Sequence, residues 1–214
     1  MESPSSVISL LRQATFRSHQ DIEDLLQLDH PGLSPERYRQ AIAGFARFLP
    51  AWEAAVVAAL PARLGPWFAK RSRLRFLARD VTALGLASAA DGAPVHLPAL
   101  SGVAAAFGSM YVLEGSALGG QVIARQVAAR LGLDPDQGAA YFTGWRAGTG
   151  TLWREFRERL EVEVGPREVD RASACDAAVQ TFAALEAVFR AVLPAPADAE
   201  LEDEDAAAAA LHGA

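Results

Sequence analysis

The chain has 214 residues, of which 51% are hydrophobic, and its formal net charge is −6. Alanine dominates the apolar fraction and favours helix over strand, so we expect an all-α fold. The acidic excess comes from residues 197–214, which hold six of the 26 acidic residues and no lysine or arginine. The remaining 20 acidic residues balance the 20 basic ones. This neutral body argues against nucleic acid as an obligate partner.

Several other classes of protein are disfavoured. The single cysteine, Cys175, excludes an intramolecular disulfide and a cysteine-cluster metal site. The first residues lack the basic start and long apolar run of a signal peptide, and no segment approaches the roughly 18 uninterrupted apolar residues of a membrane span. We therefore expect a cytoplasmic protein with no membrane partner. One domain is predicted over residues 1–196, followed by a poorly ordered, acidic and alanine-rich tail over residues 197–214.

The N-terminal half is predicted to form three helices. The first spans about residues 6–28, with Ser5 or Ser6 as its N-cap and His30-Pro31-Gly32 as its stop. The second opens at Ser34-Pro35-Glu36, and Pro50 is expected to kink or break it. The third covers about residues 66–84. Its basic run over residues 70–79 is interpreted either as a solvated helix face or as a docking surface for an acidic partner.

The C-terminal half follows a connection rich in proline and small residues over residues 87–98. A long helix is predicted over residues 99–131, ended by Gly132 and by Asp134-Pro135. Shorter helices are expected over residues 137–145 and 151–162. The last helix covers residues 167–193 and stops at Pro194. No internal repeat or shift in composition marks a second domain.

A stripe of polar residues is predicted on the first helix. Arg12, Thr15, His19 and Glu23 are separated by three, four and four residues, so they share one helix face. A neutral imidazole facing an apolar cleft can bind iron through one nitrogen, and Glu23 is placed to fix the other N–H. Arg12 can meet a ligand carboxylate. Spacing alone leaves open an ordinary histidine at the edge of the core, flanked by surface ion pairs.

A cluster of glycines interrupts the long helix at Gly115, Gly119 and Gly120. Each glycine costs about 1 kcal/mol relative to alanine in a helix interior, so a compensating role is expected. Gly115 and Gly119 lie one turn apart and leave a flat surface against which a large planar ligand can lie, with the helix free to kink over it. Close packing between helices is the alternative. A phosphate-binding loop is disfavoured because no strand precedes the glycines.

These two segments together resemble the haem oxygenase family. LRQATFRSH, residues 11–19, is similar to the proximal-helix signature that ends at the iron-ligating histidine. GSALGGQVIA, residues 115–124, is similar to the glycine-rich distal helix. YVLEGSALGG resembles the bacterial branch that includes enzymes accompanying bacterial phytochromes. The resemblance implies a single all-helical domain with haem b between the first helix and a kinked, glycine-rich helix.

The resemblance also implies roles for individual residues. His19 would be the axial ligand of the haem iron, with Glu23 as its hydrogen-bond partner. Arg12 and, on weaker grounds, Arg157 would meet haem propionates. Mammalian members carry an aspartate where this chain has Ser116, so Ser116, backbone carbonyls and water would take over its task. The implied cofactor-binding residues are Arg12, Thr15, His19, Glu23, Gly115, Gly119, Gly120 and Arg157, and the implied catalytic ones are Gly115, Ser116 and Gly119.

The implied reaction is the cleavage of haem, as both substrate and cofactor, to biliverdin, carbon monoxide and ferrous iron. It requires dioxygen and electrons from a ferredoxin, a flavodoxin or a reductase, which the basic run could dock. Biliverdin would then supply a bacteriophytochrome chromophore. A non-catalytic haem carrier or gas sensor on the same fold is the main alternative. A thiaminase-like helical hydrolase would need a nucleophilic cysteine, and Cys175 has no evident histidine partner in the sequence.

Overall fold

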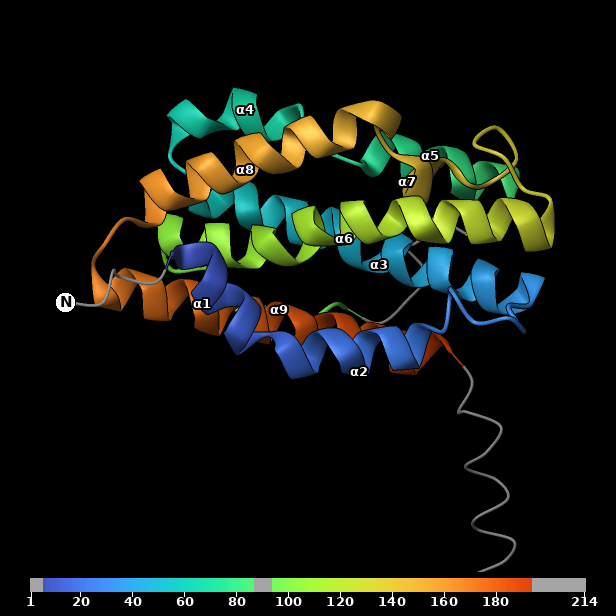
Figure 1. Ribbon diagram of the computed structural model, residues 1–214, viewed down its shortest axis with the longest axis horizontal. Coiled ribbons are helices and arrows are strands. Elements are labelled where there is room, and N and C mark those ends of the chain that lie inside the picture. Colours follow the sequence, from blue (N-terminus) through green and yellow to red (C-terminus); the bar gives the residue numbers. More distant parts are fainter. Residues whose placement is uncertain (1–5, 87–93, 194–214) are drawn as a thin grey trace, which may run out of the picture.

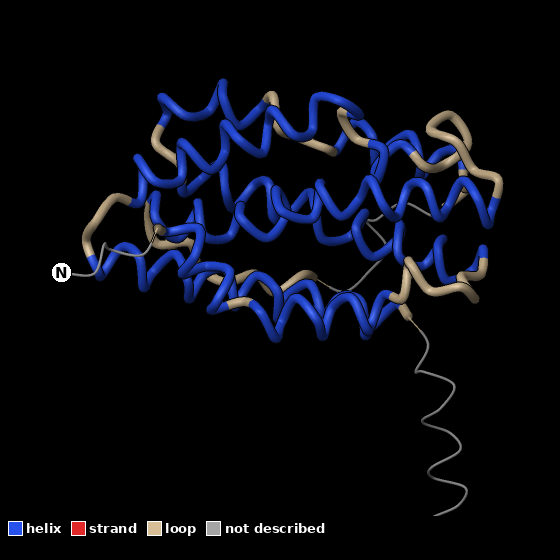
Figure 2. The backbone as a smooth tube through the Cα atoms, viewed as in Figure 1, coloured by secondary structure: helices blue, strands red, loops and turns tan. Residues whose placement is uncertain are grey.

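The computed structural model describes residues 6–86 and 94–193, and every regular element within these ranges is helical (Figure 1, Figure 2). The all-α prediction is therefore confirmed. The proposed acidic tail, the candidate cap Ser5 and most of the connection over residues 87–98 lie outside the described residues. The elements in chain order are α1 (Val7–Ala14), α2 (Phe16–Leu26), α3 (Pro35–Ala59), a 3-10 turn (Ala62–Leu64), α4 (Gly65–Ala69), α5 (Leu74–Ala83), α6 (Val103–Leu131), α7 (Ala140–Thr143), a second 3-10 turn (Arg146–Gly148), α8 (Thr149–Val164) and α9 (Glu168–Val192).

The helices form one bundle around α6. This helix packs most extensively against α9 and then against α8, while α1, α2 and α3 each pack against α9 (Figure 1). The interior is aromatic and aliphatic, with Phe107, Phe156 and Phe189 fully buried. Three polar side chains in this core are linked by hydrogen bonds: the Trp52 indole donates to Ser109 Oγ at 2.9 Å, and Ser109 and Thr181 share a hydrogen bond of 2.7 Å.

Helix α3 is the one helix in the described residues that is long and apolar enough to cross a membrane, and 56% of that stretch is buried in the bundle. Its N-terminus follows the sequence prediction, since Ser34 accepts a hydrogen bond from the Arg37 N–H and Pro35 occupies the first turn. A break at Pro50 is not observed, because α3 continues through this proline as one helix. Packing of its buried face against the bundle outweighs the missing hydrogen bond.

The predicted first helix is in fact two helices. Thr15 leaves helical geometry (φ −103°, ψ 4°) and separates α1 from α2. Its hydroxyl donates to the Leu11 carbonyl at 2.7 Å, and its N–H donates to the same oxygen at 3.0 Å. A threonine hydroxyl that competes for the carbonyl four residues back bends a helix. The single helix over residues 6–28 is therefore corrected to a broken pair, with the cap at Ser6 confirmed.

The predicted third helix is also divided, into α4 and α5, by residues 70–73. At this break Arg71 and Arg73 turn inward and are only 4% and 5% exposed. The interpretation of the whole basic run as one exposed face is therefore wrong for these two arginines. Exposure is confirmed for the other three members of the run, Lys70, Arg75 and Arg79.

The remaining boundaries differ little from the predictions, with two exceptions. Helix α6 begins four residues late, because Gly102 has a φ of 90°, and it ends as predicted at Gly132. Helix α7 is only four residues long, because Gly138 and Gly144 both have positive φ and delimit it. Helices α8 and α9 lie within two residues of their predicted limits.

Helices α6 and α9 approach each other closely at Gly108 of α6. A Cβ built there would lie 1.9 Å from the Ala174 carbonyl oxygen of α9, and backbone cannot move aside cheaply. We expect Gly108→Ala to lower the free energy of unfolding by at least about 2 kcal/mol, by forcing α6 and α9 apart. Urea unfolding checks this, with Gly150→Ala in α8 as the control, since nothing lies within 4 Å of that Cβ. Equal stability of Gly108→Ala and the wild type would contradict this packing.

Candidate functional site

The two segments singled out in the sequence face each other across a groove between α2 and α6. The groove has a volume of about 190 Å³. Its lining residues are Glu23, Leu26, Leu28, Asp29, Gly119, Val122 and Ile123. Val122, which lines the groove, is 44% exposed, and Leu118 on the same helix is 40% exposed. Apolar side chains left exposed beside an apolar groove are typical of a ligand-binding surface.

His19 lies one turn before Glu23 on α2. Its Nδ1 is 3.2 Å from Glu23 Oε2, and its side chain is 54% exposed. The imidazole also meets the Phe182 ring of α9 edge-on, with ring centroids 6.0 Å apart. The Glu23 carboxylate is thus paired with Nδ1 of His19, so Nε2 is the ring nitrogen left to bind a ligand. The predicted pairing of His19 with Glu23 is present in the structure.

Tyr111 connects the junction of α1 and α2 to α6, and the sequence reasoning missed it. Its hydroxyl lies near Thr15, which is 2% exposed, and near the Arg12 guanidinium. Burial raises the pKa of Tyr111, while Thr15 and Arg12 oppose that rise. Its position one turn before Gly115 is the sequence signal that could have identified it, because the two residues share a face of α6.

The three glycines of α6 lie in different surroundings. A Cβ at Gly119 would have no atom within 4 Å, and one at Gly115 would meet only Trp153, at 3.9 Å. Close helix packing therefore does not explain these two. Gly120 is buried, and a Cβ there would lie 3.1 Å from the Phe142 carbonyl oxygen of α7. The structure thus brings Gly119 to the groove and sets Gly120 against α7, where helix packing accounts for it.

Ser116 is turned towards the break between α4 and α5. Its hydroxyl donates to the Leu113 carbonyl at 2.8 Å and accepts from the Arg73 guanidinium at 3.0 Å. The same guanidinium donates to the Leu113 carbonyl at 2.8 Å. One lone pair of the Ser116 oxygen is left to accept another hydrogen bond, and no proton is left to donate.

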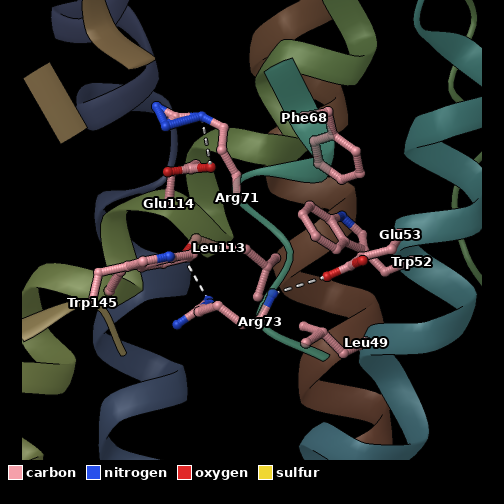
Figure 3. Close-up of a pocket in the computed structure, with 10 residues that line it drawn as sticks. Leu49, Trp52, Glu53, Phe68, Arg71, Arg73, Leu113, Glu114 and Trp145 are labelled. Atoms are coloured by element: carbon pink, nitrogen blue, oxygen red, sulfur yellow. Dashed lines mark hydrogen bonds and ion pairs between the residues drawn. The ribbon is translucent and has the colours of Figure 1, made fainter. Parts of the chain in front are cut away.

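Behind Ser116 lies a buried charged cluster formed by Glu53, Arg71, Arg73 and Glu114 (Figure 3). Arg71 Nε is 3.4 Å from Glu114 Oε1, and Glu53 Oε1 accepts the Arg73 backbone N–H at 3.3 Å. The cluster borders a small cavity of about 10 Å³, about the space of one water molecule. Burial raises the pKa of Glu114 to about 7, although Arg71 and Arg73 lower it in part. Burial also raises the pKa of Glu53.

The raised pKa of Glu114 predicts that the stability of the protein depends on pH. Between the ordinary pKa of 4.5 and about 7, the folded state binds more protons at Glu114 than the unfolded state does. The contribution of Glu114 to the free energy of unfolding therefore falls as the pH rises through this window. Glu114→Gln stays neutral and lacks this contribution. We expect the stability of the wild type relative to the variant to fall by on the order of 2 kcal/mol across the window.

Urea unfolding of both proteins at a series of pH values measures this difference directly. The comparison cancels the titration of groups that the two proteins share. A difference between wild type and variant that stays constant with pH would contradict the raised pKa of Glu114.

Arg157 lies on α8 and is exposed. It is spaced by four residues from Trp153, whose ring is 6.2 Å from that of Tyr111, and from Glu161, whose carboxylate contacts the start of α1. The three therefore share the face of α8 that is turned towards α1 and α6. Neither Arg157 nor Arg12 has an ion-pair partner among the described residues. Two guanidinium groups are thus available near one end of the groove-forming helices.

The chain was compared with protein families and with solved structures. The family model described as "Heme oxygenase" matches residues 5–191. A heme oxygenase from Neisseria meningitidis, solved in NO- and CO-bound forms, has a TM-score of 0.75 at 24% identity, covering 90% of this chain and 94% of that one. Heme oxygenase 2 from Chlamydomonas reinhardtii, solved without heme, has a TM-score of 0.68 at 19% identity, covering 90% and 100%. The curated protein sequences give no significant match.

Proposed function

The chain belongs to the haem oxygenase family of haem-degrading oxidoreductases, and on that premise we propose that it cleaves haem b to biliverdin, carbon monoxide and ferrous iron. The reaction consumes dioxygen and electrons from an external donor. The observation that carries this proposal is the groove between α2 and α6, where the helix bearing His19 and Glu23 meets the open backbone of Gly119.

The residues at the groove fit haem. His19 Nε2 would bind the iron, while Glu23 orients the ring through Nδ1. The bare backbone at Gly115 and Gly119 would lie against the macrocycle, and the exposed side chain of Val122 would cover part of its apolar face. When bound, haem supplies both the iron that activates dioxygen and the ring that is oxidised.

Arg12 and Arg157 would hold the propionates, because both guanidinium groups are exposed and without ion-pair partners in the described ranges. The groove volume of about 190 Å³ is smaller than the 300–1,000 Å³ typical of small-molecule sites. Entry of haem therefore requires α2 and α6 to separate.

Ser116 would orient water rather than donate a proton. Its only proton is engaged by the Leu113 carbonyl, and Arg73 occupies one acceptor site. The free lone pair can accept a hydrogen bond from a water molecule. This assigns Arg73 the task of fixing the Ser116 rotamer.

The physiological role that we propose is chromophore supply to a bacteriophytochrome, supported by the resemblance of YVLEGSALGG to the phytochrome-associated branch. The donor would be a ferredoxin, a flavodoxin or a reductase. Two exposed members of the basic run, Lys70 and Arg75, offer such an acidic partner a complementary surface, whereas Arg79 is ion-paired with Asp136. A hydrolase is disfavoured because burial raises the pKa of the Cys175 thiol, whereas a nucleophilic cysteine needs a lowered one.

Product identification tests the proposed reaction. Purified protein is incubated aerobically with hemin, ascorbate and catalase, which removes peroxide and so excludes uncoupled oxidation of the ring. We expect a bilin that co-elutes with biliverdin and carbon monoxide that is trapped by ferrous myoglobin. A haem complex that yields neither product with ascorbate or with a ferredoxin system would overturn the catalytic proposal in favour of a haem carrier or gas sensor.

A further inference from the structure

The N-terminus of α1 is held by the side chain of a residue 154 positions later in the sequence. Glu161, on α8, accepts the Val7 N–H at 3.1 Å through Oε2 and the Ile8 N–H at 3.2 Å through Oε1. Ser6 Oγ accepts the Ser9 N–H at 3.3 Å. The first turn of α1 contains no acidic residue of its own. Glu161 therefore supplies both the missing acceptors and the negative charge that a helix N-terminus favours.

The opposite end of α1 is attached as well. There Thr15 is buried, and Tyr111 of α6 lies next to it. Between these two attachments, Val7 and Leu11 are 1% and 0% exposed. Figure 1 shows the start of α1 next to the C-terminal end of α8. Helix α1 is thus fixed at both ends, and Glu161 provides the polar attachment at its start.

The position of α1 is transmitted to His19. The backbone hydrogen bonds continue across the junction, from the Thr15 N–H to the Leu11 carbonyl at 3.0 Å and from the His19 N–H to the Thr15 carbonyl at 2.9 Å. A displacement of the start of α1 along its axis therefore moves Thr15 and the first turn of α2. That turn places the imidazole against Phe182.

We propose that Glu161 is a positioning residue, which holds α1 so that His19 lies beside the groove between α2 and α6. The significance of His19 as an iron ligand rests on the proposed function. The position of His19 does not, because its edge-on contact with Phe182 is measurable in the haem-free protein.

The test compares Glu161→Ala with Glu158→Ala, an exposed glutamate of the same helix. In the haem-free proteins, NMR follows the amide exchange of residues 7–11 and the ring-current shift and cross-peaks of the His19 imidazole against Phe182. We expect amide exchange at least about tenfold faster in Glu161→Ala, together with a weakened His19–Phe182 contact. Glu158→Ala should match the wild type. With hemin, transfer to apomyoglobin should be about tenfold faster from Glu161→Ala.

Glu161→Gln tests whether the carboxylate itself is needed. Glutamine keeps one acceptor oxygen but presents an NH2 group to the second N–H, so we expect an intermediate exchange rate and an intermediate His19 shift. This variant decides the matter if Glu161→Ala fails to fold. An unmoved His19 signal in folded Glu161→Ala or in Glu161→Gln would overturn the positioning role. Failure of the wild type to bind hemin would count against the proposed function alone, since the His19 signals are read without haem.

Discussion

Replacing Gly119 by leucine should leave the protein folded and strongly weaken haem binding. Gly119 is exposed and nothing lies within 4 Å of a Cβ at this position, so we expect the haem-free protein to accommodate the larger side chain. Removal of a helix glycine should raise the free energy of unfolding by about 0.5–1 kcal/mol. In the complex, however, the leucine would occupy the space that we assign to the ring. We expect the hemin Kd to rise at least about a hundredfold, the equivalent of about 2.7 kcal/mol.

The opposite signs of the two effects distinguish a blocked site from a damaged protein. Gly150→Ala is the matched control, because Gly150 is also helical and also has open space at its Cβ position. It should raise stability by a similar amount and leave hemin affinity unchanged. Unfolding curves and hemin titrations of the three proteins give both quantities. Wild-type hemin affinity in Gly119→Leu would show that the ring does not lie against this part of α6.

Replacing His19 by alanine should remove the axial ligand while preserving the fold. The side chain is 54% exposed, so little buried surface is lost and the change in stability should be below about 0.5 kcal/mol. Loss of an outer partner of a metal ligand already lowers metal affinity by about 10–100-fold. Removal of the ligand itself should therefore weaken hemin binding by about a hundredfold or more and abolish product formation.

Added imidazole provides a specific check on this variant. It can occupy the vacated space and should restore a histidine-type Soret spectrum and part of the activity of His19→Ala. The control is His30→Ala, since His30 is exposed and its side chain accepts the Gly32 N–H at 3.0 Å. A His19→Ala protein with wild-type spectrum and turnover would mean that another group binds the iron.

Local signals predicted much of the fold. The caps at Ser6 and Ser34, the end of α6 at Gly132 and the extents of α8 and α9 follow from residues close in sequence. The break at Thr15 was not predicted, because a threonine hydroxyl bonded to the carbonyl four residues back, as Thr15 is to Leu11, bends some helices without ending them. The inward turn of Arg73 likewise depends on acceptors in α3 and α6.

In the candidate site, too, some features could be predicted from the sequence and others could not. Helical spacing and the resemblance placed Glu23 and Gly119 on a common ligand surface, and the structure joins them in one groove. Neither the packing of Gly120 against α7 nor the attachment of Ser116 to Arg73 has a local sequence signal. The capping of α1 by Glu161 spans 154 residues and is visible only in three dimensions. The binding and catalytic roles of these residues remain predictions.

One experiment tests the central claim most directly: a hemin titration of the purified protein, followed by ascorbate in air, recorded by absorption spectroscopy. The account predicts a one-to-one complex with a sharp Soret band, which decays after ascorbate is added while the broad red absorption of biliverdin grows. A Soret band that persists under these conditions and with a ferredoxin system would contradict haem cleavage. Absence of any complex would contradict the assignment of the groove between α2 and α6 as a haem site.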